Sequence, residues 1–293
     1  MLTEGVDFLL ADTDPYWIGR KSLAVNLSDL AAMSAVPCAV VIAVAIPQYP
    51  VRCSLGNLKS SELLDRLFQG IEPLAKQYKL DIAGGDTNTW DGGLVISITA
   101  IGKTTSHGVF RRDGAKVGDR IFVTGPLGGS ILEHQFTFEP RINEALFLNE
   151  NYEIRSAMDI SDGLSLDLSR LIEASGCGAV LYENKIPIST DAFRLAELEA
   201  ASTMTPLHGK MVSAFEHALI DGEDFELLFT VSQTIADRLL NEQPLRNGFS
   251  VELHEIGEIT QSGGMELLQT NGLLHPLVAM GYEHGAGEAS IVE

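Results

Sequence analysis

Apolar residues recur with a regular period along most of the chain. Residues 18–33 and 58–78 carry apolar positions at the helical period, so each stretch predicts an amphipathic helix. The β-branched run 38–46 predicts a strand buried on both faces, and 94–101 alternates as a further strand. The first third of the chain is therefore expected to be an α+β unit.

The remainder of the chain alternates in a different way. After a polar, glycine-containing stretch near Arg112, a new strand is expected over 120–124. Helices and strands then follow in turn: helices over 164–175, closed by Gly176, and 207–220, and strands over 225–231 and 251–256. This alternation is typical of an α/β domain. We therefore expect two domains, 1–112 and 113–293.

Composition narrows the class of protein. Hydrophobic residues make up 45% and charged residues 20% of the 293 residues, an ordinary globular balance. The net charge of −20 argues against direct binding to nucleic acid, although bound divalent cations would still allow phosphate ligands. The longest apolar run is far short of the roughly 20 residues that cross a bilayer. Three cysteines without a C-x-x-C pair indicate a reducing compartment, so we expect a cytoplasmic protein.

Four short acidic segments set among glycines and hydroxyl residues carry the candidate chemistry: 26–29, 84–87, 158–163 and 221–224. Oxygen ligands on tight backbone turns are what Mg²⁺ requires, with room left for water and phosphate. One such segment would mean little, but four of them predict a single acidic site assembled by the fold.

Each segment also has a simpler explanation. Asp159, Ser161 and Asp162 precede a predicted helix and could be N-caps, although one cap is enough and the same geometry can gather a phosphate or a metal. The segment 84–86 follows a short strand at 82–83 and could be an ordinary turn. Asp29 interrupts a small, apolar stretch, so we expect it not to be fully exposed, and a metal ion would relieve the cost of burial.

The fourth segment, 222–224, is explained almost as well by a helix-to-strand turn. The familiar P-loop, zinc and nucleophile-elbow motifs are missing from the sequence. A nucleotide enzyme with this sequence would therefore belong outside the P-loop class.

Taken together, five segments resemble the thiamine-monophosphate kinase family: 21–33, 84–87, 112–125, 158–164 and 222–228. Their order and spacing match from Met1 to about Tyr282. The resemblance implies phosphorylation of thiamine monophosphate to thiamine diphosphate by ATP. It also implies the aminoimidazole ribonucleotide synthetase-like fold: a ferredoxin-like α+β N-terminal domain, whose sheet pairs in a homodimer, followed by an α/β domain.

The resemblance also implies roles for individual residues. Several Mg²⁺ ions would be bound by Asp29, Asp86, Asp159 and Asp162. ATP would be contacted by Gly85, Asp86, Arg112 and Ser161. The thiamine substrate would lie near Asp7, Glu223 and Tyr282. The residues expected to matter most for catalysis are Asp159, Asp86 and Arg112.

The chain departs from the family pattern at its start. Members usually carry a further N-terminal segment with a Gly-Asp-Asp metal motif before the position of Met1, and Asp7 stands where a substrate-contacting histidine is common. A truncated start, metal ligands from another segment, or reduced activity are all compatible with this departure. A missing first strand would also leave a sheet edge unprotected.

Other functions remain open at this stage. The chain could be a catalytically impaired relative that binds nucleotide and Mg²⁺, or another ATP-using member of the same superfamily. It could also be a metal-dependent phosphatase, which would release phosphate without forming thiamine diphosphate.

Overall fold

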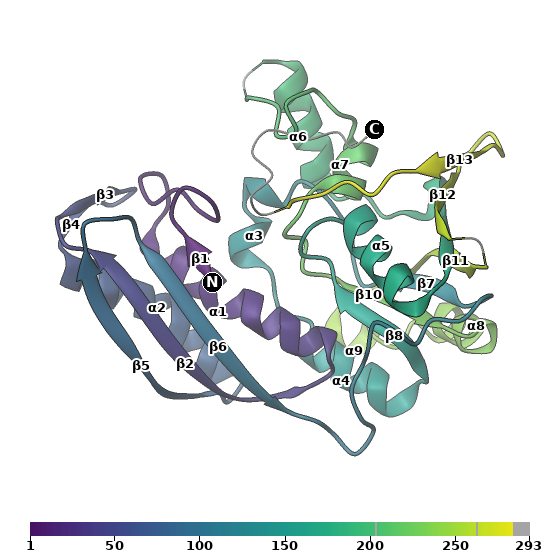
Figure 1. The fold of residues 1–293 in the computed structure, drawn as a ribbon, viewed down its shortest axis with the longest axis horizontal. Helices are drawn as coiled ribbons and strands as arrows, with labels where there is room; N and C mark the ends of the chain where they lie inside the picture. The colour runs from purple at the N-terminus through teal and green to yellow at the C-terminus, as the bar shows by residue number, and fades with distance from the viewer. Residues whose placement is uncertain (203, 262, 284–293) are drawn as a thin grey trace. The chain divides into compact units, whose positions relative to one another are not determined.

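The structure is a computed structural model that describes residues 1–202, 204–261 and 263–283. It divides into two compact units (Figure 1). Unit 1 comprises residues 1–106 together with the returning segment 136–142, and unit 2 comprises the rest. Every helix among the described residues is too short or too polar to cross a membrane. The three cysteines are free thiols.

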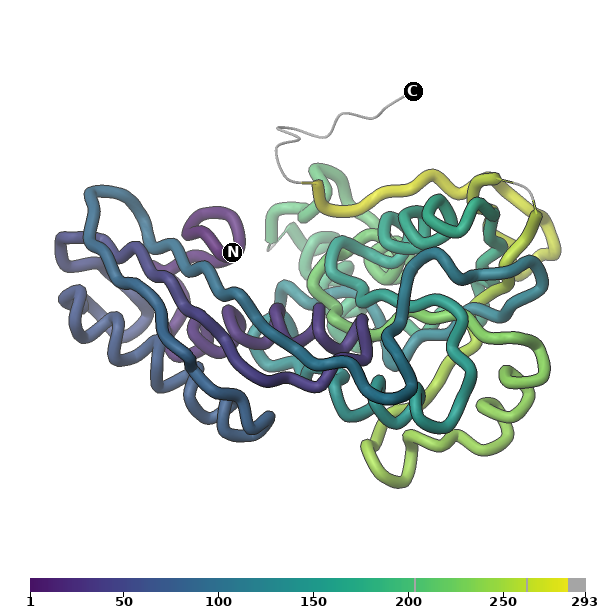
Figure 2. Tube along the Cα trace, turned by 60° about the horizontal axis from the view of Figure 1, so that its bottom comes forward, coloured from purple at the N-terminus to yellow at the C-terminus, as the bar shows by residue number. Residues whose placement is uncertain are grey.

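Unit 1 is a four-stranded sheet with two helices on one face (Figures 1 and 2). The strand order is β1-β6-β2-β5, with β2 antiparallel to β6 and parallel to β5. The strands are β1 (Leu2–Thr3), β2 (Val36–Pro47), β5 (Asp81–Trp90) and β6 (Val95–Lys103), with a small hairpin of β3 (Val51–Cys53) and β4 (Gly56–Leu58). The helices are α1 (Pro15–Ala32) and α2 (Ser60–Gln77), which confirms both predicted helices.

The two helices of unit 1 pack closely because small residues face each other. A side chain at Gly19 would place its Cβ 2.0 Å from the Leu67 carbonyl oxygen, and one at Gly70 would lie 1.9 Å from that of Tyr16. At the start of α1, the Asp14 carboxylate accepts a hydrogen bond from the Tyr16 N–H at 2.9 Å, as an N-cap does.

Two predictions for the strands of unit 1 were wrong. Strand β2 is buried on one face only: Val40 and Val44 are buried, whereas Val41 is 41% exposed, because the helices cover a single face. Gly84 and Gly85 do not follow a strand but lie within β5, whose ten residues are all exposed. Gly85 pairs with Ile42 at so close an approach that a Cβ would lie 1.8 Å from the Ile42 carbonyl oxygen, so here the glycine serves strand pairing.

Unit 2 is a seven-stranded, mostly antiparallel sheet in the order β13-β12-β9-β11-β7-β10-β8; only β12 and β9 pair in parallel. The strands are β7 (Arg120–Val123), β8 (Ile154–Asp159), β9 (Gly178–Tyr182), β10 (Leu227–Val231), β11 (His254–Thr260), β12 (Gly264–Leu268) and β13 (Leu274–Leu277). The helices that lie wholly in unit 2 are α5 (Leu164–Ser175), α6 (Thr190–Ala200), α7 (Ala214–Ile220), α8 (Gln233–Glu242) and α9 (Arg246–Phe249), with 3₁₀ turns η1 (Ser130–Leu132) and η2 (Glu183–Lys185). Helices α3 (His134–Thr137) and α4 (Ile142–Asn151) begin or end within the segment 136–142 of unit 1.

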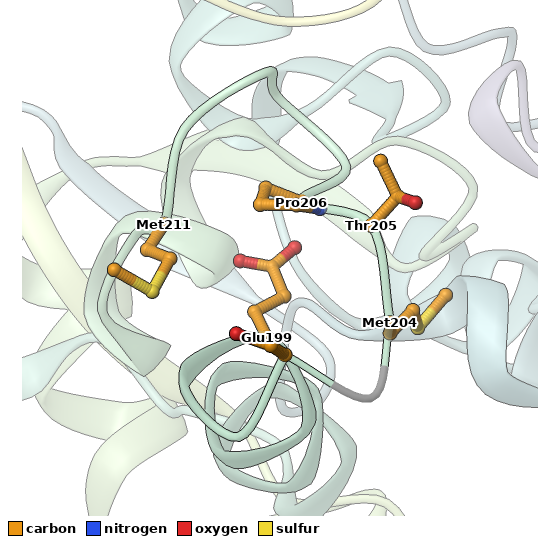
Figure 3. A pocket seen from close by; sticks show the side chains of 6 residues that line it. Glu199, Met204, Thr205, Pro206 and Met211 are labelled. Atoms are coloured by element: carbon orange, nitrogen blue, oxygen red, sulfur yellow. The ribbon is translucent and has the colours of Figure 1, made fainter.

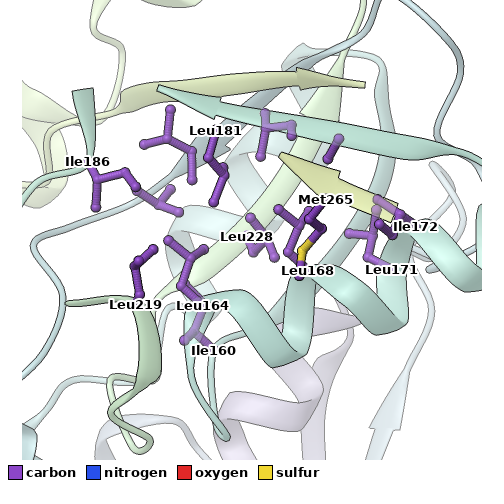
Figure 4. Close-up of a cluster of buried hydrophobic side chains, with 14 of the residues drawn as sticks. Ile160, Leu164, Leu168, Leu171, Ile172, Leu181, Ile186, Leu219, Leu228 and Met265 are labelled. Carbon is purple, nitrogen blue, oxygen red and sulfur yellow. The ribbon is translucent and has the colours of Figure 1, made fainter. Parts of the chain in front are cut away.

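The core of unit 2 lies between helix α5 and the sheet (Figure 4). Leu164, Leu168 and Leu171 of α5 are fully buried against strand residues such as Leu181 and Leu228. This helix has the predicted bounds, and Gly176 closes it in the left-handed conformation with φ 67°. This packed core therefore fixes the position of α5 and of the loop that precedes it.

The helix predicted over 207–220 is shorter than expected. Helix α7 begins only after Ser213, whose hydroxyl accepts a hydrogen bond from the Glu216 N–H while the Glu216 carboxylate accepts one from the Ser213 N–H. This capping box sets the start, and 207–213 is irregular. The strand expected at 251–256 begins at His254 and continues to Thr260.

Candidate active site

The loop 160–163 between β8 and α5 contains the sequence-predicted residues Ser161 and Asp162, and Asp159 ends the strand before it. Asp159 is only 4% exposed. The backbone N–H groups of Ser161 and Asp162 both donate to Oδ2 of Asp167, at 3.0 and 2.8 Å. Residue Gly163 occupies the N-cap position and makes no side-chain cap. Asp167 therefore fixes the loop from within the helix, and N-capping does not explain the acids of 159–162.

The electrostatics of this loop fit a hard cation. Burial, with the neighbouring charges of Asp162 and Asp159, raises the pKa of Asp167 to about 6, although Arg170 opposes the rise. Arg170 donates to both Asp162 and Asp167, the latter at 2.8 Å. Two carboxylates, those of Asp162 and Asp167, thus share one guanidinium, and the charge of Asp159 acts on Asp167 from nearby. Oxygen donors of this kind suit Mg²⁺, and Asp159 and Asp162 are the residues that would hold it.

A second acidic segment, 221–226, lies directly against this loop. The N–H of Glu223 donates to the Ser161 carbonyl at 2.8 Å, and the N–H of Phe225 donates to the Ile160 carbonyl at 2.8 Å. A Cβ at Gly222 would lie 2.8 Å from the same Ser161 oxygen. Two of the four predicted acidic segments, distant in the sequence, are therefore joined by backbone hydrogen bonds.

Within this second segment the acids have different tasks. Asp224 is buried and accepts hydrogen bonds from the Gly128 N–H at 2.9 Å and the Ser130 hydroxyl at 2.5 Å, and burial raises its pKa well above the usual range. Asp221 accepts one from the Gly129 N–H at 2.7 Å. These two acids hold the turn 128–130, a structural task that the sequence did not indicate. Glu223 is half-buried and has a left-handed backbone, with φ 68°.

Tyr282 joins the same region from the end of the described chain. Its N–H donates to the Asp162 carbonyl at 2.9 Å, and its side chain is 45% exposed. The Ser165 hydroxyl donates to the Met280 carbonyl at 2.6 Å, which fixes the preceding residues against α5. The structure thus brings together Asp159, Ser161, Asp162, Glu223 and Tyr282.

Arg112 is exposed, and its backbone lies elsewhere in unit 2. Its carbonyl accepts a hydrogen bond at 2.8 Å from the hydroxyl of Ser175, the last residue of α5. Helix α5 has 12 residues, so its two ends are about 18 Å apart. The Arg112 backbone therefore lies at the end of α5 opposite to the loop 160–163.

The predicted ligands of unit 1 are exposed. Asp29 lies near the end of α1 and is exposed to solvent, whereas the neighbouring Leu27 and Leu30 are buried on another side of the helix. Asp86 lies on β5 opposite Ala43, on the sheet face that the helices leave uncovered. Gly85 precedes it in the same exposed strand.

Asp7 is half-buried and tied to its neighbours in unit 1. Its Oδ2 accepts a hydrogen bond from the Thr3 N–H at 2.6 Å, and its carbonyl accepts one from Nζ of Lys21 at 2.7 Å. Lys21 is fully buried and also lies 5.3 Å from the centre of the Phe136 ring. The sequence reasoning assigned no role to this buried lysine.

Asp167 and Arg170 were also missed as site residues. A signal was present, because an acid in the first helical turn complements the helix dipole and a residue three positions later shares its face. The pair could have been recognised from the spacing of Asp162, Asp167 and Arg170 around the predicted helix start.

Two family models match the chain in succession. Residues 1–104 match the AIR synthase related protein, N-terminal domain, and residues 116–268 match the AIR synthase related protein, C-terminal domain. Among individual relatives, the thiamine-monophosphate kinase of Rhodopirellula baltica is 36% identical over 284 residues, which cover 97% of this chain and 81% of that protein. The thiamine-monophosphate kinase of Bacillus subtilis is 29% identical and covers 97% and 86%, respectively.

Solved structures agree with the fold. Thiamine-monophosphate kinase from Stenotrophomonas maltophilia K279a superposes with a TM-score of 0.74 at 30% identity, over 91% of this chain and 82% of that one. AaThiL complexed with AMPPCP and TMP superposes with a TM-score of 0.75 at 26% identity, over 97% and 84%. The expected two-domain architecture is confirmed. The chain therefore belongs to the thiamine-monophosphate kinase family, as the resemblance of its five segments indicated.

Proposed function

We propose that this protein phosphorylates thiamine monophosphate to thiamine diphosphate with ATP. The relatives that match nearly its whole length are named for this activity. AaThiL, which matches 97% of the chain, was solved with AMPPCP, an analogue of ATP, and TMP. The observation in this chain that carries the proposal is the hydrogen-bonded convergence of the Asp159–Asp162 loop with the Glu223 segment.

Phosphoryl transfer to a phosphate requires the neutralisation of negative charge more than it requires a general base. The acceptor is already a phosphate anion, and it must approach a second anion in line. We assign Asp29, Asp86, Asp159 and Asp162 as the Mg²⁺ ligands of the enzyme. Bound Mg²⁺ would neutralise phosphate oxygens. No covalent nucleophile is assigned.

The chain's own residues position the reactants. Asp167 holds the two N–H groups of the loop, so the carboxylates of Asp159 and Asp162 start from a fixed backbone. Arg112 and Ser161 are proposed to bind the ATP phosphates, and Gly85, which also allows the close pairing of β5 with β2, is proposed to contact ATP. We propose that the thiamine moiety lies near Asp7, Glu223 and Tyr282.

We also propose that two copies pair through the sheet of unit 1. The helices cover one face of this sheet, and the other face exposes Val41 at 41% and Ile101 at 50%. Strand β5 is exposed along its whole length. Exposed apolar sheet faces and long open strands are typical of interfaces. We propose that the protein acts in the cytoplasm, where its three free thiols would stay reduced. We also propose that residues 1–112 form the N-terminal domain and residues 113–293 the C-terminal domain.

Turnover of ATP with thiamine monophosphate, with and without Mg²⁺, tests the activity. Thiamine diphosphate should form in proportion to the ATP consumed, and only with the metal. Phosphate release without thiamine diphosphate would indicate a phosphatase. Nucleotide binding without turnover would indicate an impaired relative.

The mass in solution tests the dimer. Light scattering should give twice the 31.6 kDa of one chain. Ile101→Lys, which places a charge on the exposed sheet face, should yield single chains that retain their secondary structure. A wild-type mass of one chain would contradict the pairing.

A further inference from the structure

A second cluster of potential metal ligands lies in unit 2, outside the residues proposed for phosphoryl transfer. One ligand atom from each of His208, His217 and Asp221 lies within 4.8 Å of the other two. Nε2 of His208 is 2.7 Å from Oδ1 of Asp221, and Nδ1 of His217 is 3.0 Å from the same oxygen. The three side chains therefore already point toward one position.

The fold holds two of these residues rigidly. His217 is in α7 and Asp221 caps its end, four positions later, so one helix face presents both. Both are buried, with His217 at 0% and Asp221 at 2% exposure. The second carboxylate oxygen of Asp221 accepts the Gly129 N–H at 2.7 Å, which orients Oδ1 toward the histidines. His208 comes from the irregular segment before α7 and is partly exposed.

A fourth residue, Glu199, is evidence that the cluster binds a metal ion and is not only a hydrogen-bond network. Nε2 of His217 and Oε2 of Glu199 are both buried and have no hydrogen-bond partner, although they lie only 3.7 Å apart. The other Glu199 oxygen accepts the Leu207 N–H at 2.7 Å. Buried polar atoms without partners are costly. Histidines that bind a metal usually direct their second ring nitrogen at a carboxylate, which is the arrangement seen here.

We propose that His208, His217 and Asp221 bind a divalent transition-metal ion of the Zn²⁺ class, with Glu199 orienting His217. Two imidazole nitrogens and one carboxylate oxygen suit Zn²⁺, whereas Mg²⁺ prefers oxygen ligands alone. Three protein ligands leave a fourth position for water or another small ligand. This site is separate from the ligands proposed for Mg²⁺ and does not depend on the proposed kinase activity.

An open pocket lies next to the cluster on the side of Glu199. It has a volume of about 390 Å³, and Figure 3 shows the Glu199 carboxylate pointing into it between Met204, Pro206 and Met211. The pocket thus borders Glu199, whose own side chain is buried beside His217. A bound ion would fasten the segment around His208 to α7, immediately before Gly222 and Glu223.

Metal binding by the full-length protein tests this proposal. Chelator-treated protein is dialysed against Zn²⁺ in a large excess of Mg²⁺, which fills oxygen-only sites, and bound Zn²⁺ is measured by elemental analysis. One tightly held Zn²⁺ per chain is expected. Co²⁺ in its place should give the absorption spectrum of a four-coordinate ion. The absence of a stoichiometric Zn²⁺ in the wild-type protein would overturn the proposal.

Three variants make the test specific. His208→Ala should lower the Zn²⁺ affinity at least 100-fold, whereas His275→Ala, at an exposed histidine of β13, should leave it unchanged. Glu199→Gln keeps an acceptor for Leu207 and should lower the affinity about 10–100-fold, as changes behind a ligating histidine do. Circular dichroism verifies that each variant is folded. Equal Zn²⁺ binding by His208→Ala and the wild type would show that the ion sits elsewhere.

Discussion

The two units hold their proposed acidic ligands in opposite ways. In unit 2, Asp159 is 4% exposed, and the loop after it is tied by hydrogen bonds to Asp167 and to the Glu223 segment. In unit 1, Asp29 and Asp86 lie exposed on a helix and on an open strand. In unit 2 the acids thus belong to a buried, hydrogen-bonded loop, whereas in unit 1 they lie on solvent-exposed surface.

The largest effect is expected from the buried acid of unit 2. Asp159→Asn should lower the rate of phosphoryl transfer by about 10²–10³-fold or more, the size typical of losing one fixed electrostatic group. The melting temperature should change little, because the amide has nearly the same shape. Steady-state kinetics and thermal unfolding measure both. Asp237→Asn, at an exposed helix position, is the matched control; unchanged turnover in Asp159→Asn would remove this residue from the site.

Arg112 tests whether a residue far from the loop along α5 contributes to ATP binding. Arg112→Ala should weaken the binding of ATP by about 1.5–3 kcal/mol, the usual contribution of a hydrogen bond to a charged group. The neighbouring Arg111 pairs with Asp113 at 2.7 Å, so Arg111→Ala is a close control in which ATP affinity should stay the same. Calorimetric titration with a non-hydrolysable analogue compares the two. Similar affinities in both variants would count against Arg112.

Asp86 tests the exposed acids of unit 1 directly. Asp86→Asn should raise the Mg²⁺ concentration for half-maximal activity by about tenfold, roughly 1.4 kcal/mol of metal binding. Saturating Mg²⁺ should restore most of the rate, since no preformed loop is lost. Activity measured against Mg²⁺ concentration tests this. A rate loss that no Mg²⁺ concentration rescues would make Asp86 equivalent to Asp159 and break the contrast between the units.

Asp14 is an acid of unit 1 that hydrogen bonds hold in place. It caps α1 and accepts hydrogen bonds from Arg66 at 2.8 and 2.6 Å. Asp14→Ala should lower the free energy of unfolding by about 1 kcal/mol, as cap losses do. Asp12→Ala, at an exposed position without a cap, should change it little. Denaturant unfolding of the two variants is the measurement.

The same substitution predicts a pH dependence. Chiefly through its side-chain hydrogen bond, Arg66 holds the pKa of Asp14 below its usual range. The carboxylate therefore stabilises the fold above the pKa of an unfolded aspartate, and this stabilisation is lost as the pH falls through the lower folded pKa. The difference between wild type and Asp14→Ala should be constant near pH 6 and shrink below about pH 4. A difference that grows in acid would contradict this origin.

The sequence was most informative where local signals and packing agree. The apolar period of 164–175, with Gly176 after it, predicted α5 to the residue, because the helix buries one stripe and ends at a left-handed glycine. The position of Asp159 before that helix followed directly. The backbone hydrogen bond from the Glu223 N–H to the Ser161 carbonyl could not be foreseen, since it depends on how distant strands pair.

The failures have physical causes of the same kind. The strand at 82–83 was expected to end at Gly84 and Gly85, but pairing with β2 extends it through them. The apolar residues after Leu207 suggested a helix, and the Ser213–Glu216 capping box that sets its true start was overlooked. The exposure of Asp29 depends on which side of α1 packs against the sheet, and the composition of the surrounding stretch does not show that side.

The left-handed backbone at Glu223 affects how the stability of this enzyme can be engineered. A glycine would adopt φ 68° without steric strain, whereas a residue with a Cβ at such a position costs of order 1 kcal/mol or more. Glu223→Gly should thus relax the turn while deleting the carboxylate. A directed-evolution experiment that selects for thermal stability alone would favour this substitution. The variant would gain stability but lose the carboxylate that is proposed to contact the substrate.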